Sequence, residues 1–194
     1  GWEAVPSANA IIGLVAEQKS KPLAPVKSLT VAVLVTIRDE DAHDVIAGKL
    51  SLLRSLRHNS RHSFVLHILS DSTSLARVAE EQHLVTTAFP LPVFHHHRPI
   101  NVDFKSGNIR NWIGNHGADH DAFIILDADS ELDRSTALAL ADFLSADPAC
   151  GLIQTTPIVL PGNTRWQRMQ SIASHNYGGL QGQGLSVWMG DEAN

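Results

Sequence analysis

Short apolar runs recur along the chain between residues 29 and 157, and polar or turn-forming residues bound each of them. The first run, LTVAVLVTI, is rich in β-branched residues, which favour strands. Apolar runs of this length without polar alternation are typical of strands buried on both faces of a parallel sheet. The pattern predicts strands at residues 29–37, 64–70, 93–98, 123–126 and 151–157.

The segments between these runs carry apolar residues at helical spacing, as Ile46, Leu50, Leu53 and Leu56 illustrate. The spacing predicts helices at residues 41–56, 75–83 and 107–115. A further helix is expected after Asp133, a natural N-cap. Its apolar face would carry Ala137, Leu140, Ala141 and Leu144. Strands that alternate with helices predict an α/β fold, a doubly wound and mainly parallel sheet with flanking helices.

The composition narrows the class of protein. Residues 1–28 contain Pro6, Pro22 and Pro25 and are expected to be a linker or N-terminal extension ahead of one domain, residues 29–194. A net charge of -5 disfavours nucleic acid as a partner. The single cysteine, Cys150, favours a reducing compartment. No apolar stretch is long enough to span a membrane, and no GxGxxG or GxxxxGK[ST] loop is present.

Acidic residues follow three of the predicted strands. Asp39 and Asp71 come after the first two, and the run FIIL ends at Asp127 and Asp129. Because the carboxyl ends of parallel strands meet at one edge of a sheet, these acids should share a cleft. Oxygens spaced as Asp-x-Asp suit a hard divalent cation that bridges a diphosphate. Taken singly, Asp39 or Asp71 is more often a helix cap or turn former.

Five motifs stand in the order and spacing of the family-two inverting glycosyltransferases, which the chain resembles: TVAVLVTIRDED, ILSDS, KSGNI, IILDADS and GLIQTTP. The resemblance implies a GT-A-like fold and transfer of glucose from UDP-glucose to a growing β-glucan acceptor. It also implies a Mg²⁺ or Mn²⁺ cofactor. The parent protein would be a multi-pass enzyme of the bacterial inner membrane, with this domain at the cytoplasmic face.

The resemblance also assigns roles to residues on the donor side. Asp71 would contact the uracil or ribose, and Asp39 with Glu40 would form the corner beside the nucleotide. Lys105, in KSGN, would offset the charge of the diphosphate.

The remaining assignments concern the sugar and the metal ion. Asp127 and Asp129 would hold the nucleotide sugar and the cation, with Asp129 the more direct metal ligand. Thr155 would flank the sugar or acceptor path.

The same resemblance predicts that part of the catalytic apparatus lies beyond Asn194. An inverting transfer needs a general base near the acceptor hydroxyl, and the family supplies it from a later motif, followed by Gln-x-x-Arg-Trp. The fragment is therefore expected to bind donor without turnover. The apolar stripe of residues 163–177 is expected either to pack in the core or to contact the membrane surface or transmembrane helices of the parent.

Alternative interpretations remain open. The triplet His95–His97 could suggest a metal site, but consecutive strand residues point to opposite faces, which favours a polar edge strand. Asp-x-Asp also occurs in phosphatases of the haloacid dehalogenase type, although there it follows the first strand. A non-catalytic nucleotide-sugar sensor would retain the same pocket.

Overall fold

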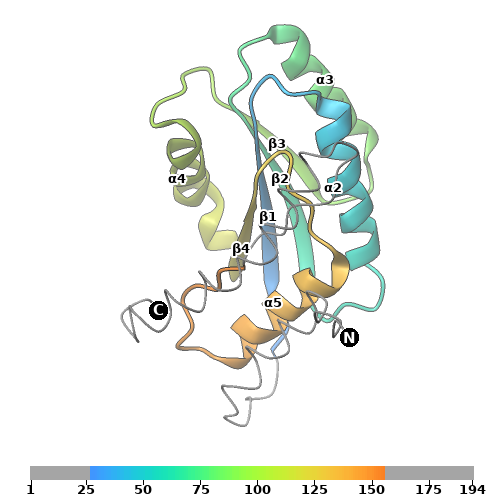
Figure 1. Cartoon of the computed structure of the whole chain (residues 1–194), viewed down its shortest axis with the longest axis vertical. Coiled ribbons are helices and arrows are strands. Elements are labelled where there is room, and N and C mark those ends of the chain that lie inside the picture. The colour runs from blue at the N-terminus through green and yellow to red at the C-terminus, as the bar shows by residue number, and fades with distance from the viewer. Residues whose placement is uncertain (1–26, 156–194) are drawn as a thin grey trace, which may run out of the picture. The chain divides into compact units, whose positions relative to one another are not determined.

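A four-stranded, entirely parallel sheet forms the centre of the computed structural model, which describes residues 27–155 (Figure 1). The strands lie in the order β3-β2-β1-β4. Their bounds are β1 Thr30–Ile37, β2 Ser63–Ser70, β3 Val93–His97 and β4 Ala122–Leu126. The register pairs Val31 of β1 with Phe64 of β2 and with Ala122 of β4. Four of the five predicted strands are therefore confirmed.

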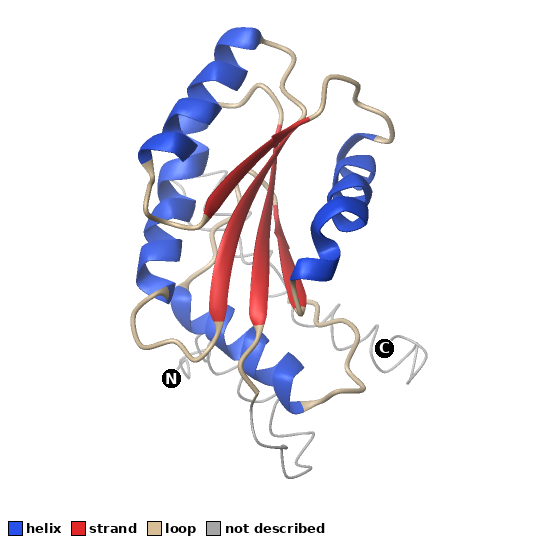
Figure 2. Ribbon diagram, turned by 180° about the vertical axis from the view of Figure 1, so that it is seen from behind, coloured by secondary structure: helices blue, strands red, loops and turns tan. Residues whose placement is uncertain are grey.

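Helices cover both faces of the sheet (Figure 2). One face carries α2 (Ala42–Leu56), α3 (Leu75–Thr87) and α5 (Arg134–Ala146). The opposite face carries α4 (Phe104–His116), which continues into the short 3₁₀ helix η1 (Gly117–Asp119). The predicted doubly wound α/β fold is confirmed, and it is consistent with a GT-A-like architecture.

The alternation of side chains along β1 creates two separate cores. Val31, Val33 and Val35 pack toward α2 and α5, whereas Ala32 and Leu34 pack against the buried Trp112 of α4. Because successive strand residues point to opposite faces, a strand that is apolar at every position must be covered on both sides. The sequence of β1 therefore requires the helix layers that the structure has.

Aspartates begin two of the helices. Asp41 accepts hydrogen bonds from the backbone N–H groups of His43 and Asp44 at the start of α2. Asp133, the predicted N-cap, accepts one from the N–H of Thr136. Hydrogen bonds from Ser135 and Thr136 lower the pKa of Asp133 to about 2. Both caps supply acceptors for N–H groups that have no partner within the helix.

The structure corrects two predicted helices. α3 runs to Thr87, past the predicted end at residue 83, and α4 begins at Phe104 and not at residue 107. The KSGN motif therefore lies in the first turn of α4. There a Cβ on Gly107 would stand 2.0 Å from the carbonyl oxygen of Val102, so only glycine allows this close approach.

The strand predicted at residues 151–157 is wrong for its described part, because residues 151–155 have no regular secondary structure. These residues belong to a second compact unit, residues 148–194, separate from residues 1–147. The predicted linker at residues 1–28, apart from its last two residues, and the apolar stripe at residues 163–177 lie outside the described residues. Within the described part, no helix is both long and apolar enough to cross a membrane.

Four histidines that are scattered in the sequence meet between the sheet and α4. The rings of His67 and His120 contact Trp112. His96 of β3 stacks on His67, and the ring centres of His96 and His116 of α4 are 4.6 Å apart. The triplet His95–His97 divides as expected, because His96 faces this cluster while His95 binds Glu81 on the opposite face. The cluster itself was not predicted.

The hydrogen bonds of this cluster fit neutral rings. Nδ1 of His120 lies 3.2 Å from the carbonyl oxygen of His116, so it must donate, which leaves Nε2 of His120 as an acceptor for Nε2–H of His67 at 3.4 Å. Nδ1 of His67 then accepts from Nε2 of His96 at 2.9 Å. Burial, followed by the neighbouring histidines, lowers the pKa of His67 to about 3 and that of His96 to about 4.

Acidification is expected to destabilise the fold through this cluster. The pKa values of His67 and His96 in the folded chain lie below the ordinary histidine value. At a pH between the folded and unfolded pKa values, the unfolded chain therefore binds more protons than the folded chain, and the free energy of unfolding falls as the pH drops. We expect each of the two histidines to lower the free energy of unfolding by about 2 kcal/mol when the pH falls from about 7 to about 5. Urea unfolding at both pH values measures it.

A pair of variants isolates the cluster in that measurement. His67→Phe should lose less stability on acidification, whereas the exposed His83, replaced by Phe, should leave the loss unchanged. Equal losses in the two variants would contradict this account.

Candidate functional site

The acids predicted to converge do lie at one edge of the sheet. Asp39, Asp71 and Asp127 follow the carboxyl ends of β1, β2 and β4, which are neighbouring parallel strands. The ends of β1 and β2 are also joined directly, because the N–H of Asp71 donates to the carbonyl oxygen of Ile37 at 2.9 Å. The order of the strands thus gathers residues that are separated by up to 88 positions in the sequence, from Asp39 to Asp127.

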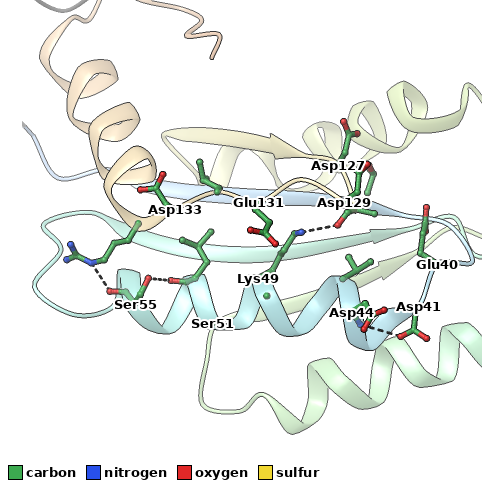
Figure 3. A pocket seen from close by; sticks show the side chains of 17 residues that line it. Glu40, Asp41, Asp44, Lys49, Ser51, Ser55, Asp127, Asp129, Glu131 and Asp133 are labelled. Atoms are coloured by element: carbon green, nitrogen blue, oxygen red, sulfur yellow. Dashed lines mark hydrogen bonds between the residues drawn. The ribbon is translucent and has the colours of Figure 1, made fainter. Parts of the chain in front are cut away.

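The Asp-x-Asp pair sits in a tight turn after β4, which we call the acidic turn (Asp127–Ser130). The N–H of Ser130 donates to the carbonyl oxygen of Asp127 at 3.1 Å and closes it. The carboxylates of Asp127 and Asp129 are exposed. Lys49 of α2 lies below the turn (Figure 3) and donates to the carbonyl oxygens of Ala128 at 2.9 Å and Ser130 at 2.6 Å.

A cavity of about 1030 Å³ opens between α2 and the segment from Asp127 to Arg134 (Figure 3). Its charged lining is mostly acidic: Glu40, Asp41, Asp44, Asp127, Asp129, Glu131 and Asp133 stand against Lys49 and Arg134. Such a lining creates a negative potential that favours a cation. Glu40, predicted beside the nucleotide, lines this cavity and also accepts a hydrogen bond from the N–H of Arg38.

The donor set suits a divalent cation that is shared with its ligand. Asp127 and Asp129 offer hard carboxylate oxygens, which Mg²⁺ and Mn²⁺ prefer. Among residues 27–155, no group of three or more acidic, histidine or cysteine side chains is placed to hold an ion. Mg²⁺ is usually held by one or two carboxylates together with substrate phosphates. The acidic turn fits that arrangement better than a closed protein site.

Lys105 reaches the acidic turn from the other face of the sheet. Its amino group pairs with Asp127, and both side chains are partly exposed. The structure thus joins two motifs that the sequence places 22 residues apart. A cation in this position can also bind a diphosphate, which is the role predicted for Lys105.

Asp71 is buried and already engaged. Arg98 holds its carboxylate through two hydrogen bonds, of 2.8 Å and 2.9 Å. The same guanidinium donates to the carbonyl oxygens of Val102 and Phe104 at 3.0 Å. Asp71 therefore fixes the loop of residues 98–104 through Arg98, at the edge where the sequence predicted a contact with uracil or ribose.

Asp39 binds the loop just before α3. It accepts hydrogen bonds from the N–H groups of Thr73 at 2.9 Å and Ser74 at 3.0 Å and from the hydroxyl of Thr73 at 2.7 Å. The hydrogen bonds from Ser74 and Thr73 hold the pKa of Asp39 below its ordinary value. Its backbone lies in the left-handed region with φ 58°, which aspartate tolerates in turns.

A buried polar network joins the loop after β1 to the loop after β2. Glu81 of α3 is fully buried, accepts a 2.6 Å hydrogen bond from the hydroxyl of Ser72, and contacts Nε2 of His95 at 2.8 Å. The Ser72 hydroxyl oxygen in turn accepts from the N–H of Asp39 at 2.8 Å. The hydrogen bond from His95 and those from the serines lower the pKa of Glu81 against the effect of burial. The network fixes the two loops relative to each other.

Thr155 is exposed and lies in the second compact unit, so the structure does not place it relative to the acidic turn. Three residues that shape the site were missed. No local sequence pattern marks Arg98 or Glu81, because the residues they bind lie elsewhere in the sequence. Lys49 did have a signal, since it interrupts the apolar face of α2 between Ile46 and Leu50.

Comparisons with known proteins bear on this geometry. The chain is 36% identical to a glucans biosynthesis glucosyltransferase H of Rhodopseudomonas palustris over 174 residues, 88% of this chain. Proteins of the same name from Vibrio cholerae and Shewanella oneidensis are 31% and 34% identical across the whole chain. The chain spans only about a quarter of these relatives, 24% to 28% of their length. No protein-family model matches the chain.

Breaking the buried pair should destabilise the fold. Arg98→Met leaves the Asp71 carboxylate buried without its partner, and we expect the free energy of unfolding to fall by about 3 kcal/mol in urea titrations. The double variant Asp71→Asn/Arg98→Met removes the stranded charge and should be more stable than Arg98→Met alone.

Arg110→Met is the matched control for this experiment, because its pair with Asp103 is exposed. We expect it to change stability by less than about 1 kcal/mol. If Arg98→Met has as small an effect as Arg110→Met, Asp71 does not depend on Arg98 for its place in the fold.

Proposed function

Because the chain is homologous to a segment of the glucans biosynthesis glucosyltransferase H proteins, we propose that it is the nucleotide-sugar-binding part of a glucosyltransferase in glucan synthesis. In this proposal the donor is UDP-glucose, the acceptor is a growing β-glucan, and the transfer inverts the anomeric centre. The observation that carries it is the acidic turn, with two exposed carboxylates beside a negatively charged cavity at the carboxyl edge of a parallel sheet. Ligands of open α/β sheets bind at that edge.

In this proposal, different residues at the carboxyl edge bind the metal ion, bind the diphosphate and position the surrounding loops. Asp127 and Asp129 would hold Mg²⁺ or Mn²⁺, which when bound neutralises charge on the departing diphosphate. Lys105, which pairs with Asp127, would add a second positive charge beside the diphosphate. Asp71 and Arg98 fix the loop that borders the nucleotide, and Asp39 fixes the start of α3. Glu40 lines the cavity beside them.

The acceptor side of the proposal rests on the resemblance alone. Thr155 would flank the path of the sugar or acceptor, and the general base would come from the motif expected after Asn194. The parent protein would act at the cytoplasmic face of the bacterial inner membrane, with its transmembrane helices or the membrane surface as a partner.

The position of Asp-x-Asp favours this proposal over a phosphatase. In a haloacid dehalogenase-type phosphatase the nucleophilic aspartate would follow the first strand. Here the pair follows β4, at the edge of the described sheet. The central strand β1 is followed by Asp39, whose carboxylate binds Thr73 and Ser74 just before α3. A carboxylate engaged in three hydrogen bonds is a poor nucleophile.

Calorimetric titration of UDP and UDP-glucose, with and without Mn²⁺, tests the proposal. We expect Mn²⁺ to strengthen binding and Asp129→Ala to weaken the Mn²⁺-dependent part by roughly tenfold or more, because the variant loses one ionic ligand of the cation. The exposed Asp119, replaced by Ala at the amino end of β4, is the control and should bind as the unsubstituted chain does.

Two outcomes would argue against the proposal. Binding of UDP that is indifferent to both Mn²⁺ and Asp129→Ala would mean that the acidic turn does not hold a metal–nucleotide complex. Absence of binding in a folded chain would refute a donor pocket within these residues.

A further inference from the structure

Lys49 is buried where α2 would be expected to carry an apolar residue. It lies among Ile46, Leu50 and Leu53, and only 7% of its surface is exposed. Burial lowers the pKa of its amino group, while the carboxylates of Glu131 and Asp129 act in the opposite direction. A lysine in such a place is rarely stable unless its N–H groups are satisfied.

The partners of this amino group belong to the acidic turn. Its two hydrogen bonds end on the carbonyl oxygens of Ala128 and Ser130, the residues on either side of Asp129. Lys49 therefore fixes the position of the backbone immediately before and after Asp129. Its side chain lies beside Glu131 and below the acidic turn (Figure 3).

Few other backbone contacts hold this segment. Within the described residues, one backbone hydrogen bond closes the turn, from the N–H of Ser130 to the carbonyl oxygen of Asp127. β4 is the last strand of the described sheet and pairs with β1 alone. A short loop after an edge strand samples several conformations unless side chains fix it. Carboxylates that must share one cation gain affinity when the backbone holds them in place beforehand.

We propose that Lys49 is a positioning residue for the acidic turn, which it holds in the conformation that presents Asp127 and Asp129 to a complex of a divalent cation with a nucleoside diphosphate. The choice of ligand rests on the proposed function above. The ordering of the turn by Lys49 is a property of the unliganded chain and can be measured without ligand.

Hydrogen exchange of the unliganded chain is the first test. Lys49→Met keeps the apolar stem of the side chain but removes the donors, and it should speed amide exchange across residues 127–131 at least several-fold. Arg54→Met is the matched control, because it removes a positive charge from the exposed face of the same helix and should leave exchange in the turn unchanged. Equal exchange in the two variants would overturn the proposal.

Titration with UDP and Mn²⁺ is the second test. Lys49→Met should weaken Mn²⁺-dependent binding of UDP by about ten- to hundredfold and leave metal-free binding of UDP unchanged. Lys49→Arg, which keeps donors for both carbonyl oxygens, should recover part of the loss. A general loss of folding would lower both kinds of binding together, so this division separates positioning from stability.

The outcomes remain distinguishable from failure of the proposed function. If the unsubstituted chain shows no Mn²⁺-dependent binding of UDP, the ligand is wrong, and the exchange experiment still decides whether Lys49 orders the turn. If binding occurs but Lys49→Met does not weaken it, the positioning role is wrong and the proposed function stands. Should Lys49→Met not fold, Lys49→Gln replaces it, because its amide is too short to reach both carbonyl oxygens.

Discussion

The structure depends on the balance of carboxylates at the carboxyl edge of the sheet. Parallel pairing brings the ends of β1, β2 and β4 together, and acidic residues follow all three. Like charges gathered at one edge would repel one another unless other groups engage them. Asp71 has Arg98 and Asp127 has Lys105, while backbone N–H groups and a hydroxyl engage Asp39. Asp129 is exposed, and Lys49 engages the carbonyl oxygens of its two neighbours and not its carboxylate.

These partners do more than neutralise charge, because each also fixes a piece of backbone. Arg98 joins Asp71 to the carbonyl oxygens of the loop before α4, and Asp39 joins the end of β1 to the start of α3. Each contact thus connects loops that belong to different strands. A site whose loops are fixed before the ligand arrives loses less conformational entropy on binding. Asp39 and Asp71, which the resemblance assigns to the nucleotide, therefore also hold the loops at this edge of the sheet in place.

The sequence predicted the strands and the convergence of acids well, because both follow from local patterns. A run such as TVAVLVTI can only be buried on both faces, and parallel order then fixes where Asp39, Asp71 and Asp127 must lie. The partners of these acids could not be predicted in the same way. Arg98 lies 27 residues from Asp71, and His67 meets His120 across 53 residues, so only the packed fold identifies them. The predicted start of α4 at residue 107 was also too late, because the helix begins at Phe104. Gly107 lies in its first turn, where a Cβ would meet the carbonyl oxygen of Val102, a contact that the sequence does not reveal.

The two faces of the sheet contribute differently to the acidic turn. From the α2 face, Lys49 holds the backbone of the turn through a side chain that is almost fully buried. From the α4 face, Lys105 holds the carboxylate of Asp127 through a side chain that remains partly exposed. The position of Lys105 depends on the docking of α4, which Trp112 and the neutral histidine cluster provide. A cation that approaches Asp127 must compete with Lys105, whereas the contacts of Lys49 leave the carboxylates free. Two lysines on opposite faces of the sheet therefore have different roles. Lys49 supports the backbone of the turn, and Lys105 supplies a positive charge at its surface that a bound cation could replace.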